Sequence, residues 1–362
     1  PQPTAFLAGV PRNQEPRLSS PHRAAAHRIR PPSPATMDHF QDGHHVRLRS
    51  RVQRTYLHAA ADGESVTLSQ PRASMNAAWA VHIYDGGDGE GEGDGDGPYL
   101  LLHSAAYGRY LSATARPARR GHHGLRVELR DYDQPEVEAI KWRAIGSGFA
   151  DDVVMLRHVG GSYLRANGKY LPWNSTGVSV DDKASSMMYW IVEPIPLREA
   201  GIPAIPGPLP TPLIDLSAIF TRRGAEREIR GVEPIPGEAA MPADHSPNRP
   251  IFSAIFSSRG RRIRFVLALE DGYYPEDPED DGWQQFWFRG RSAFSLRGYL
   301  AAHIDEDDPN IAMCVRAGRH GRLTPLVVDL PNGGYGGTLE IVVFLAGTPG
   351  YDALRYPDVD AQ

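Results

Sequence analysis

The chain has 362 residues, a formal net charge of −5 and 41% hydrophobic residues, with 32 prolines and 37 glycines. This length allows two or three domains with sizeable cores, and so mild a charge gives no reason to expect a nucleic acid partner. Cys314 is the single cysteine, which excludes an internal disulfide, and no run reaches the roughly 18 apolar residues of a membrane span. We therefore expect a cytoplasmic protein without membrane association.

The first segment, residues 1–36, differs in composition from the rest of the chain. It holds five arginines and one acidic residue, Glu15. An organelle transit peptide has such a composition. We favour a different interpretation, an upstream extension with Met37 as the natural start, and we predict that residues 1–36 are disordered.

A short phrase then recurs three times, as TYLHAA (55–60), GRYLSA (108–113) and SYLRAN (162–167). The tyrosines of the three copies are 54 and 53 residues apart. Each copy holds four short runs, most of which alternate apolar and polar residues as half-buried strands do, and a tryptophan opens or lies near the start of the fourth. We predict that the repeated residues form a shared core; they are Tyr56, Leu57, Trp79, Tyr110, Leu111, Trp142, Tyr163, Leu164 and Trp190.

Twelve short strands in three equivalent units favour a closed structure, because closure removes the exposed edges of an open sheet. Three units are too few for a propeller, which usually needs four or more blades. The sequence therefore predicts a mostly β protein that begins with a β-trefoil over residues 37–196.

A proline-rich stretch follows at residues 197–250, and its composition is typical of an extended linker. Within it, SAIFTRRGAEREIR (217–230) resembles SAIFSSRGRRIRF (253–265). We favour a duplication remnant or chance over the alternative, in which the first segment pairs as an added strand.

Residues 251–358 show a different order of elements. Strand-like runs at 262–269 and 284–290 flank an acidic loop at 270–282, a helical pattern capped by Ser292 covers 292–304, and strands are expected at 311–317, 324–330 and 339–345. Two strands, a helix and further strands indicate a smaller α+β domain of the β-grasp, ubiquitin-like type.

The repeated Tyr-Leu steps, each followed by a strand with tryptophan, resemble the fascin-like β-trefoil. The opening MDHFQDGHHVRLRS and the segment LRANGKYLPWN resemble a plant family of unknown function that carries an actin cross-linking domain. The later segments FRGRS, CVRAGRHGRLTPLVVDLP and LRYPDVDA resemble the second, ubiquitin-like domain of that family. The resemblance implies association with actin or another protein partner.

Motifs of catalysis or cofactor binding are not found. The sequence has no phosphate-binding loop and no nucleophile elbow, and the apolar run around Cys314 predicts a buried thiol. Histidines 39, 44, 45, 122 and 123 match no zinc spacing, so we expect them at the solvated surface. The Gly- and acid-rich residues 85–97 lack the register of a calcium loop. We expect no metal, no cofactor and no enzymatic activity.

One basic strand is the candidate binding surface. In VRLRSRV (46–52), apolar residues alternate with Arg47, Arg49 and Arg51, and Arg54 extends the set. Such a row could meet an acidic partner such as actin, or a phosphate-bearing ligand. The alternative that we favour is an ordinary solvated face, which also protects the strand from edge pairing.

The sequence thus predicts a non-enzymatic binding or scaffold protein that binds a protein partner. Actin is one candidate for this partner. The alternative is a lectin-like trefoil that binds a carbohydrate or another small molecule. The turns of the three copies differ, as Gln53-Arg54, Tyr107-Gly108 and Gly160-Gly161, which argues against a binding pocket repeated in each copy. The sequence does not indicate an oligomeric state.

Overall fold

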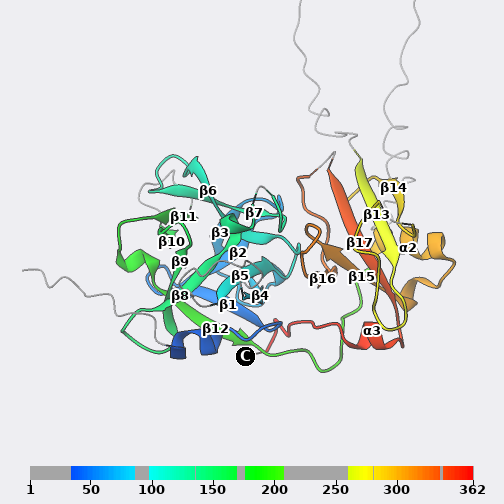
Figure 1. Ribbon diagram of the computed structural model, residues 1–362, viewed down its shortest axis with the longest axis horizontal. Helices are drawn as coiled ribbons and strands as arrows, with labels where there is room; N and C mark the ends of the chain where they lie inside the picture. Colours follow the sequence, from blue (N-terminus) through cyan, green and yellow to red (C-terminus); the bar gives the residue numbers. More distant parts are fainter. Residues whose placement is uncertain are drawn as a thin grey trace, which may run out of the picture.

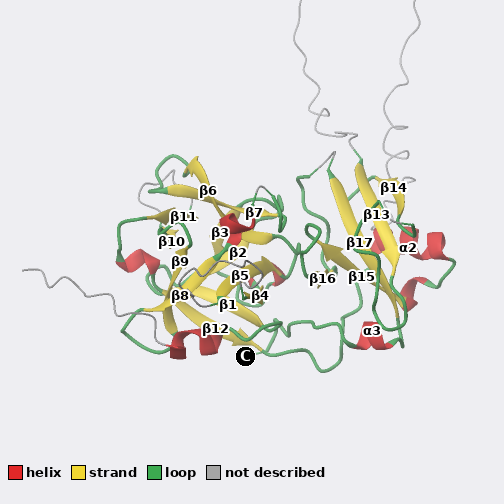
Figure 2. Cartoon of the chain, viewed as in Figure 1, coloured by secondary structure: helices red, strands yellow, loops and turns green. Residues whose placement is uncertain are grey.

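The computed structural model describes residues 34–85, 98–134, 136–168, 176–207, 260–279, 281–334 and 337–361. The strands of these residues form a twelve-stranded sheet and a five-stranded sheet, which lie side by side as two domains (Figure 1, Figure 2). Three of the predicted segments lie outside the described residues. They are the N-terminal extension before residue 34, residues 86–97 of the Gly- and acid-rich segment, and both SAIF segments except for residues 260–265. None of the described helices is long and apolar enough to cross a membrane.

The twelve-stranded sheet is built from three copies of a four-strand unit. They are β1 (His45–Ser50), β2 (Tyr56–Ala59), β3 (Val66–Ser69) and β4 (Trp79–Tyr84); β5 (Tyr99–Ser104), β6 (Tyr110–Pro117), β7 (Leu125–Arg130) and β8 (Trp142–Gly146); and β9 (Val153–His158), β10 (Tyr163–Asn167), β11 (Gly177–Asp181) and β12 (Trp190–Ile195). Antiparallel pairing of β12 with β1 joins the last strand to the first. The predicted β-trefoil is confirmed.

The same residue types open the same strands in every copy. The second strand of each copy begins at a tyrosine and the fourth at a tryptophan, which a short 3-10 helix precedes. These helices are η2 (Met75–Ala77), η3 (Val137–Ile140) and η4 (Ser186–Met188). The nine repeated Tyr, Leu and Trp residues are all buried, and the three tryptophans have no exposed surface. A further helix, η1 (Pro34–His39), precedes β1.

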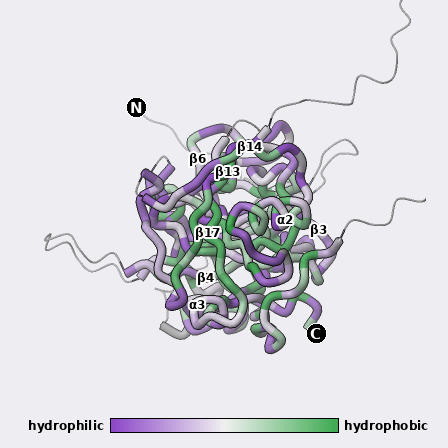
Figure 3. The backbone as a smooth tube through the Cα atoms, turned by 90° about the vertical axis from the view of Figure 1, so that its right-hand side faces the viewer, coloured by the Kyte–Doolittle hydropathy of each residue, from purple (hydrophilic) through white to green (hydrophobic). Residues whose placement is uncertain are grey.

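The second domain is a mixed sheet with one helix on a face. Its elements are β13 (Arg261–Leu267), β14 (Gln284–Phe288), α2 (Ala293–Ile304), η5 (Asp308–Asn310), β15 (Ile311–Arg316), β16 (Leu323–Pro325), β17 (Thr338–Leu345) and α3 (Pro349–Asp352). The strand order is β14-β13-β17-β15-β16, with β13 and β17 parallel and the other pairs antiparallel. This order and the helix confirm the predicted ubiquitin-like α+β fold. Hydropathy colouring shows β17, the central strand, as hydrophobic along most of its length (Figure 3).

Helix α2 begins where the sequence predicted. The hydroxyl of Ser292 accepts a hydrogen bond from the amide of Ser295 at 3.2 Å, which is the bond of an N-cap. Leu296 and Leu300 are fully buried against the sheet, in one cluster with Phe265 and Ile341. The helix therefore covers one face of the sheet.

The strand expected at 324–330 is wrong over most of its length. The strand ends at Pro325, and the amide of Leu326 makes one further hydrogen bond to β15, to the carbonyl of Met313 at 2.8 Å. Beyond Pro325, Leu326 packs into the ubiquitin-like core, and Val327 packs into the trefoil core. The apolar run is buried because it passes between two domains, and a sheet is not needed to bury it.

Candidate binding sites

The predicted basic strand does not present its arginines together. Arg47 is fully buried, so the prediction of an exposed residue there is wrong. Its Nη2 donates to the carbonyl of Val359 at 2.5 Å, and its Nε donates to the carbonyl of Arg72 at 3.0 Å. Burial lowers the pKa of the Arg47 guanidinium. The strand alternation placed Arg47 on the outer face of the barrel, but a segment from the other end of the chain covers that face.

The other three arginines have different surroundings. Arg49 lies in β1, which ends at Ser50, and Arg51 and Arg54 follow the strand. Arg49 forms an ion pair with Glu193, with Nε 2.7 Å from the carboxylate. Arg51 lies over the ring of Phe149, 4.5 Å from its centroid. Arg54 lies in the turn before β2 with a left-handed φ of 54°. The structure therefore does not bring the four predicted residues into one site.

The covering segment, residues 356–361, lies on the trefoil and forms a turn at residues 359 and 360. Tyr356 packs into the trefoil core, and its carbonyl accepts a hydrogen bond from the amide of Arg198 at 2.9 Å. The amide of Asp358 donates to the carbonyl of Pro196 at 2.9 Å. Arg72 donates through Nη1 to the carbonyl of Ala361 at 2.6 Å. Main-chain groups of the segment thus make most of these bonds.

The trefoil departs from threefold symmetry where the ubiquitin-like domain contacts it. In each copy the repeated tyrosine pairs with a residue of the preceding strand. The facing residues are Arg49, His103 and Arg157. Only the histidine of these three is fully buried, which suits a surface that another domain covers.

His103 and Tyr110 of the second copy form hydrogen bonds with the ubiquitin-like domain. Nδ1 of His103 lies 3.1 Å from the hydroxyl of Thr324, and the amide of Arg322 donates to the hydroxyl of Tyr110 at 2.9 Å. The guanidinium of Arg322 also pairs with Asp42 at 2.9 Å. The Tyr-Leu step of the second copy thus contributes both to the core and to the contact between domains.

The histidines of this contact are held neutral. His45 is only 6% exposed, which corrects the prediction that it is solvated. Burial lowers the pKa of His45 to about 4, and burial with the nearby Arg322 lowers the pKa of His82 to about 4. Burial also lowers the pKa of His103 well below the ordinary value. Over the described part of the chain, no group of three or more His, Cys, Asp or Glu residues could hold a metal ion.

A cleft of about 560 Å³ lies between the domains. The trefoil contributes residues from its β2–β3 turn, the turn around Tyr107 and the loop after β7, while the ubiquitin-like domain contributes β15, β17 and the chain between β16 and β17. Its size lies in the range of small-molecule sites.

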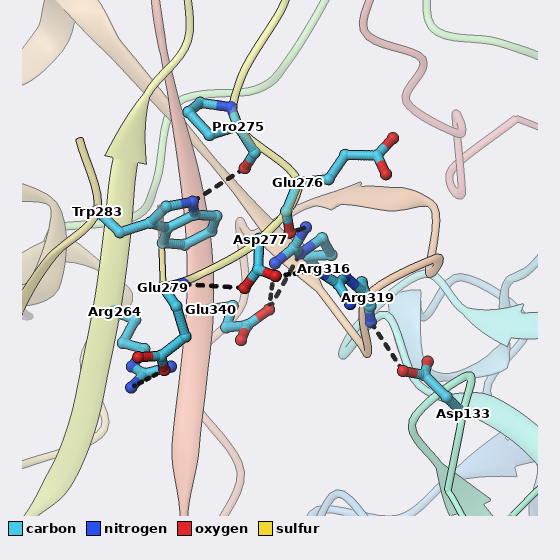
Figure 4. Close-up of polar contacts among 10 residues, drawn as sticks. All are labelled: Asp133, Arg264, Pro275, Glu276, Asp277, Glu279, Trp283, Arg316, Arg319 and Glu340. Atoms are coloured by element: carbon cyan, nitrogen blue, oxygen red, sulfur yellow. Dashed lines mark hydrogen bonds and ion pairs between the residues drawn. The ribbon is translucent and has the colours of Figure 1, made fainter. Parts of the chain in front are cut away.

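The wall of this cleft on the ubiquitin-like side is fixed by Arg316 (Figure 4). Its side chain has no exposed surface, and Nε and Nη2 donate to one oxygen of Glu340 at 3.0 and 2.8 Å. Nη1 donates to the carbonyl of Glu276 at 2.6 Å. Arg319, which pairs with Asp277, donates its amide to Asp133 of the trefoil at 3.2 Å. The acidic loop predicted at 270–282 is thus attached to the sheet and, through Arg319, to the trefoil.

An apolar groove of about 430 Å³ lies on the far part of the ubiquitin-like domain, between the end of β13, the acidic loop and the end of α2. Three apolar side chains that line it are exposed to a large degree: Leu267 by 39%, Leu269 by 62% and Tyr273 by 64%. Large exposed apolar groups that share one surface mark interaction sites in soluble proteins. The sequence signal for the groove is the apolar run RIRFVLAL, which continues two residues beyond the strand.

Acidic residues adjoin the groove on each side. All six are exposed: Glu270, Asp281 and Asp305 directly follow or precede lining residues in the chain, and Asp271, Glu306 and Asp307 lie within three residues of one. His303 is the one basic residue in the lining. The lining of the groove is therefore mostly apolar, and the chain next to it is rich in exposed acidic residues.

Fold and surfaces together define a two-domain protein, in which a β-trefoil is packed against a ubiquitin-like domain. Residues 37–193 match the family model described as a beta-trefoil domain of unknown function (DUF569), and residues 259–344 match the DUF569 associated ubiquitin-like domain. The chain thus carries a DUF569 β-trefoil and the ubiquitin-like domain associated with it. Neither family description names a ligand or a partner.

Solved structures with similarity to the chain align over about the length of the trefoil. An SDF2-like protein from Arabidopsis thaliana is 19% identical, covering 42% of this chain and 93% of that one with a TM-score of 0.36. A ricin B-like lectin from Macrolepiota procera, in complex with lactose, is 15% identical and covers 42% and 96% with a TM-score of 0.33. A designed threefold protein, ThreeFoil, is 18% identical and covers 41% and 97% with a TM-score of 0.31. A comparison with curated proteins finds no significant match.

Proposed function

We propose that this chain is a non-enzymatic binding protein whose apolar groove docks a basic, amphipathic segment of a protein partner. The observation that carries the proposal is the combination of Leu267, Leu269 and Tyr273, all substantially exposed, with acidic residues on each side of them. An amphipathic helix that lays its apolar face into a groove is a common mode of peptide recognition. Lysine or arginine beside that apolar face would complement the acidic residues.

The lone thiol gives no support to one kind of enzyme, a cysteine-dependent one. Cys314 is fully buried in the sheet, and burial raises the pKa of its thiol far above the ordinary value. A buried thiol of this kind is inert, because the thiolate is the nucleophile.

Actin, the partner implied by the resemblance, is also a proposal, and the trefoil arginines give it little support. Arg47 is covered and Arg49 is paired with Glu193, which leaves Arg51 and Arg54 of the four predicted arginines to meet a partner. Co-sedimentation with actin filaments over a salt series tests this partner. A protein that stays in the supernatant at low salt would rule it out.

The lectin-like alternative meets an obstacle at one of the three turns. Tyr107-Gly108 of the second copy faces the ubiquitin-like domain, where a side chain at Gly108 would lie 3.4 Å from the Thr324 hydroxyl. A glycan site repeated on all three turns is therefore not available in the full chain.

Fluorescence anisotropy with a labelled amphipathic peptide of leucine and lysine, about 18 residues long, tests the groove. Two control peptides are a scrambled sequence of the same composition and a leucine–glutamate peptide. We expect binding of the first peptide alone, and weaker binding as salt rises, because salt screens charges that are exposed.

Variants locate the bound peptide. Tyr273→Ser and Leu269→Ser remove apolar contacts and should each weaken binding about tenfold, the factor that 1.4 kcal/mol represents. Phe149→Ser is the matched control, because Phe149 is 49% exposed on the trefoil, away from the groove. Equal losses in the control and in the groove variants, or equal binding of all three peptides, would refute the proposed function.

A further inference from the structure

We propose that the cleft between the two domains is a separate binding site for a neutral, polyhydroxylated small molecule such as a sugar or a cyclic polyol. The cleft shares no lining residue with the apolar groove. The proposal therefore does not depend on the protein partner. It also places the ligand between domains and not on the repeated turns of the trefoil.

Charge balance in the lining selects a neutral ligand. The lining holds four carboxylates and four guanidinium groups, which are those of Asp62, Asp131, Asp133, Glu340, Arg109, Arg261, Arg316 and Arg319. Three of the arginines have carboxylate partners: Arg109 pairs with Asp131, Arg316 with Glu340 and Arg319 with Asp277. A charged ligand would lose its hydration in the cleft without meeting an excess of the opposite charge, and such a loss is costly.

Open acceptor atoms in the same lining select hydroxyl groups. Arg109 donates to Oδ1 of Asp131 at 2.9 Å, and Nε and Nη2 of Arg316 donate to Oε2 of Glu340. Among the described residues, no donor reaches Oδ2 of Asp131 or Oε1 of Glu340. Both side chains are partly exposed, and an ionised carboxylate only accepts hydrogen bonds, so a ligand that contacts these oxygens does so as a donor.

Two exposed side chains supply the complementary groups. Gln134 lies in the loop after β7 and Thr338 opens β17, and both line the cleft. The amide of Gln134 can donate and accept, and so can the hydroxyl of Thr338. A hydroxyl group of a ligand likewise donates one bond and accepts others, so it can use the carboxylates and these side chains together.

Apolar residues complete the lining. They are Tyr107, Pro278, Val315, Leu326, Leu330, Pro331 and Leu339. A sugar presents C–H groups beside its hydroxyls, and sites for small ligands combine an apolar lining with a few polar groups that fix orientation. The lining thus matches a ligand with both kinds of surface.

Saturation-transfer NMR and titration calorimetry on the full chain test the site. The probes are glucose, galactose, sucrose, trehalose and myo-inositol, with glucuronate and glucosamine as charged counterparts. We expect at least one neutral probe to bind and the charged counterparts to bind at least tenfold more weakly. If no neutral probe binds, or if a charged probe binds equally well, the proposal is wrong.

Substitutions assign binding to the cleft. Thr338→Trp places a large side chain in the cleft from an exposed strand position and should abolish binding without lowering the melting temperature. Asp131→Asn should weaken binding about tenfold, because an acceptor of a charged group is lost. Asp182→Asn is the control, since Asp182 is exposed on the trefoil outside the cleft. Binding that survives Thr338→Trp, or that falls equally in the control, would overturn the assignment.

Each variant is also tested with the ligand of the other site, which distinguishes the two sites. Thr338→Trp should leave the leucine–lysine peptide bound, and Tyr273→Ser should leave the sugar bound. Loss of sugar binding in Tyr273→Ser would show that the cleft is not an independent site.

Discussion

The indole Nε1 of Trp79 donates a hydrogen bond to the main-chain carbonyl of Leu57 at 3.1 Å, inside the trefoil core. The other copies repeat the bond, from Trp142 to Leu111 at 2.9 Å and from Trp190 to Leu164 at 3.0 Å. The tryptophan that opens the fourth strand is therefore bonded to the Tyr-Leu step of the same copy. A buried indole needs an acceptor, which is why the two motifs recur together.

Substitution of Trp142 by phenylalanine removes this donor and leaves the Leu111 carbonyl without it. An unsatisfied buried polar group costs about 1–3 kcal/mol of the free energy of unfolding, and the smaller ring adds the cost of a cavity. Urea unfolding measures the loss. Trp287→Phe is the control, because Trp287 is 61% exposed, and it should change stability by less than about 0.5 kcal/mol. Equal effects of the two variants would contradict the role of the bond.

The trefoil could be predicted because its information is local and repeated. Strand alternation, the Tyr-Leu step and the tryptophan recur at nearly constant spacing, and each copy buries the same residues. The ubiquitin-like domain followed from its order of elements, and Ser292 marked the start of its helix.

The contact between the domains could not be predicted in the same way. Alternation places Arg47 and His45 on the outer face of β1, but it does not say which surface another segment covers. Val359, which accepts from Arg47, lies 312 residues away in the chain. The cleft likewise combines loops of two domains, and no local pattern relates Asp131 to Glu340.

Release of the covering segment is expected when Arg47 is replaced by methionine. The change removes the donors to Val359 and Arg72 and keeps a long side chain in the buried position. Hydrogen exchange at the amide of Asp358, which bonds Pro196, should then become at least about tenfold faster, since exchange follows local opening. Arg51→Met should leave this amide protected. Unchanged exchange in the Arg47 variant would show that other contacts hold the segment.

Stability should fall with acidification because of the neutral histidines. The pKa of His45 is about 4 in the folded chain, below the ordinary value of 6.5, so the unfolded chain binds its proton first as pH falls. Above pH 6.5 His45 is neutral in both the folded and the unfolded chain. Between about pH 6.5 and 4 the preferential protonation of the unfolded chain lowers the free energy of unfolding by roughly 3 kcal/mol. His103 and His82, whose pKa values are also lowered, act in the same direction.

The urea midpoint measured from pH 7.5 to 4 checks this dependence. His45→Gln should show a shallower decline than the natural sequence, because glutamine does not titrate. Carboxylates with lowered pKa, such as Asp42 and Asp62, titrate equally in both proteins, so the difference between the curves reports on His45. Parallel curves would mean that His45 does not cause the decline.

The ion pair of Arg316 with Glu340 should be the most sensitive polar contact of the ubiquitin-like domain. The Arg316 side chain has no exposed surface, its guanidinium lies 4.9 Å from the ring centroid of Trp283, and Glu340 is 20% exposed. Arg316→Met leaves the Glu340 carboxylate and the Glu276 carbonyl without their donor. Breaking a buried pair in this way lowers the free energy of unfolding by about 3–5 kcal/mol. The double variant Arg316→Met with Glu340→Leu removes both charges and should recover a large part of the loss.

An exposed pair on the same sheet provides the comparison. Arg264 pairs with Glu279 at 3.1 Å, but the Glu279 side chain is 79% exposed, so Arg264→Met should cost less than about 1 kcal/mol. Urea unfolding of the four proteins, with the natural sequence as reference, separates burial from charge. If the Arg264 variant loses as much stability as the Arg316 variant, or if the double variant is no more stable than Arg316→Met, the cost does not come from an unpaired buried charge.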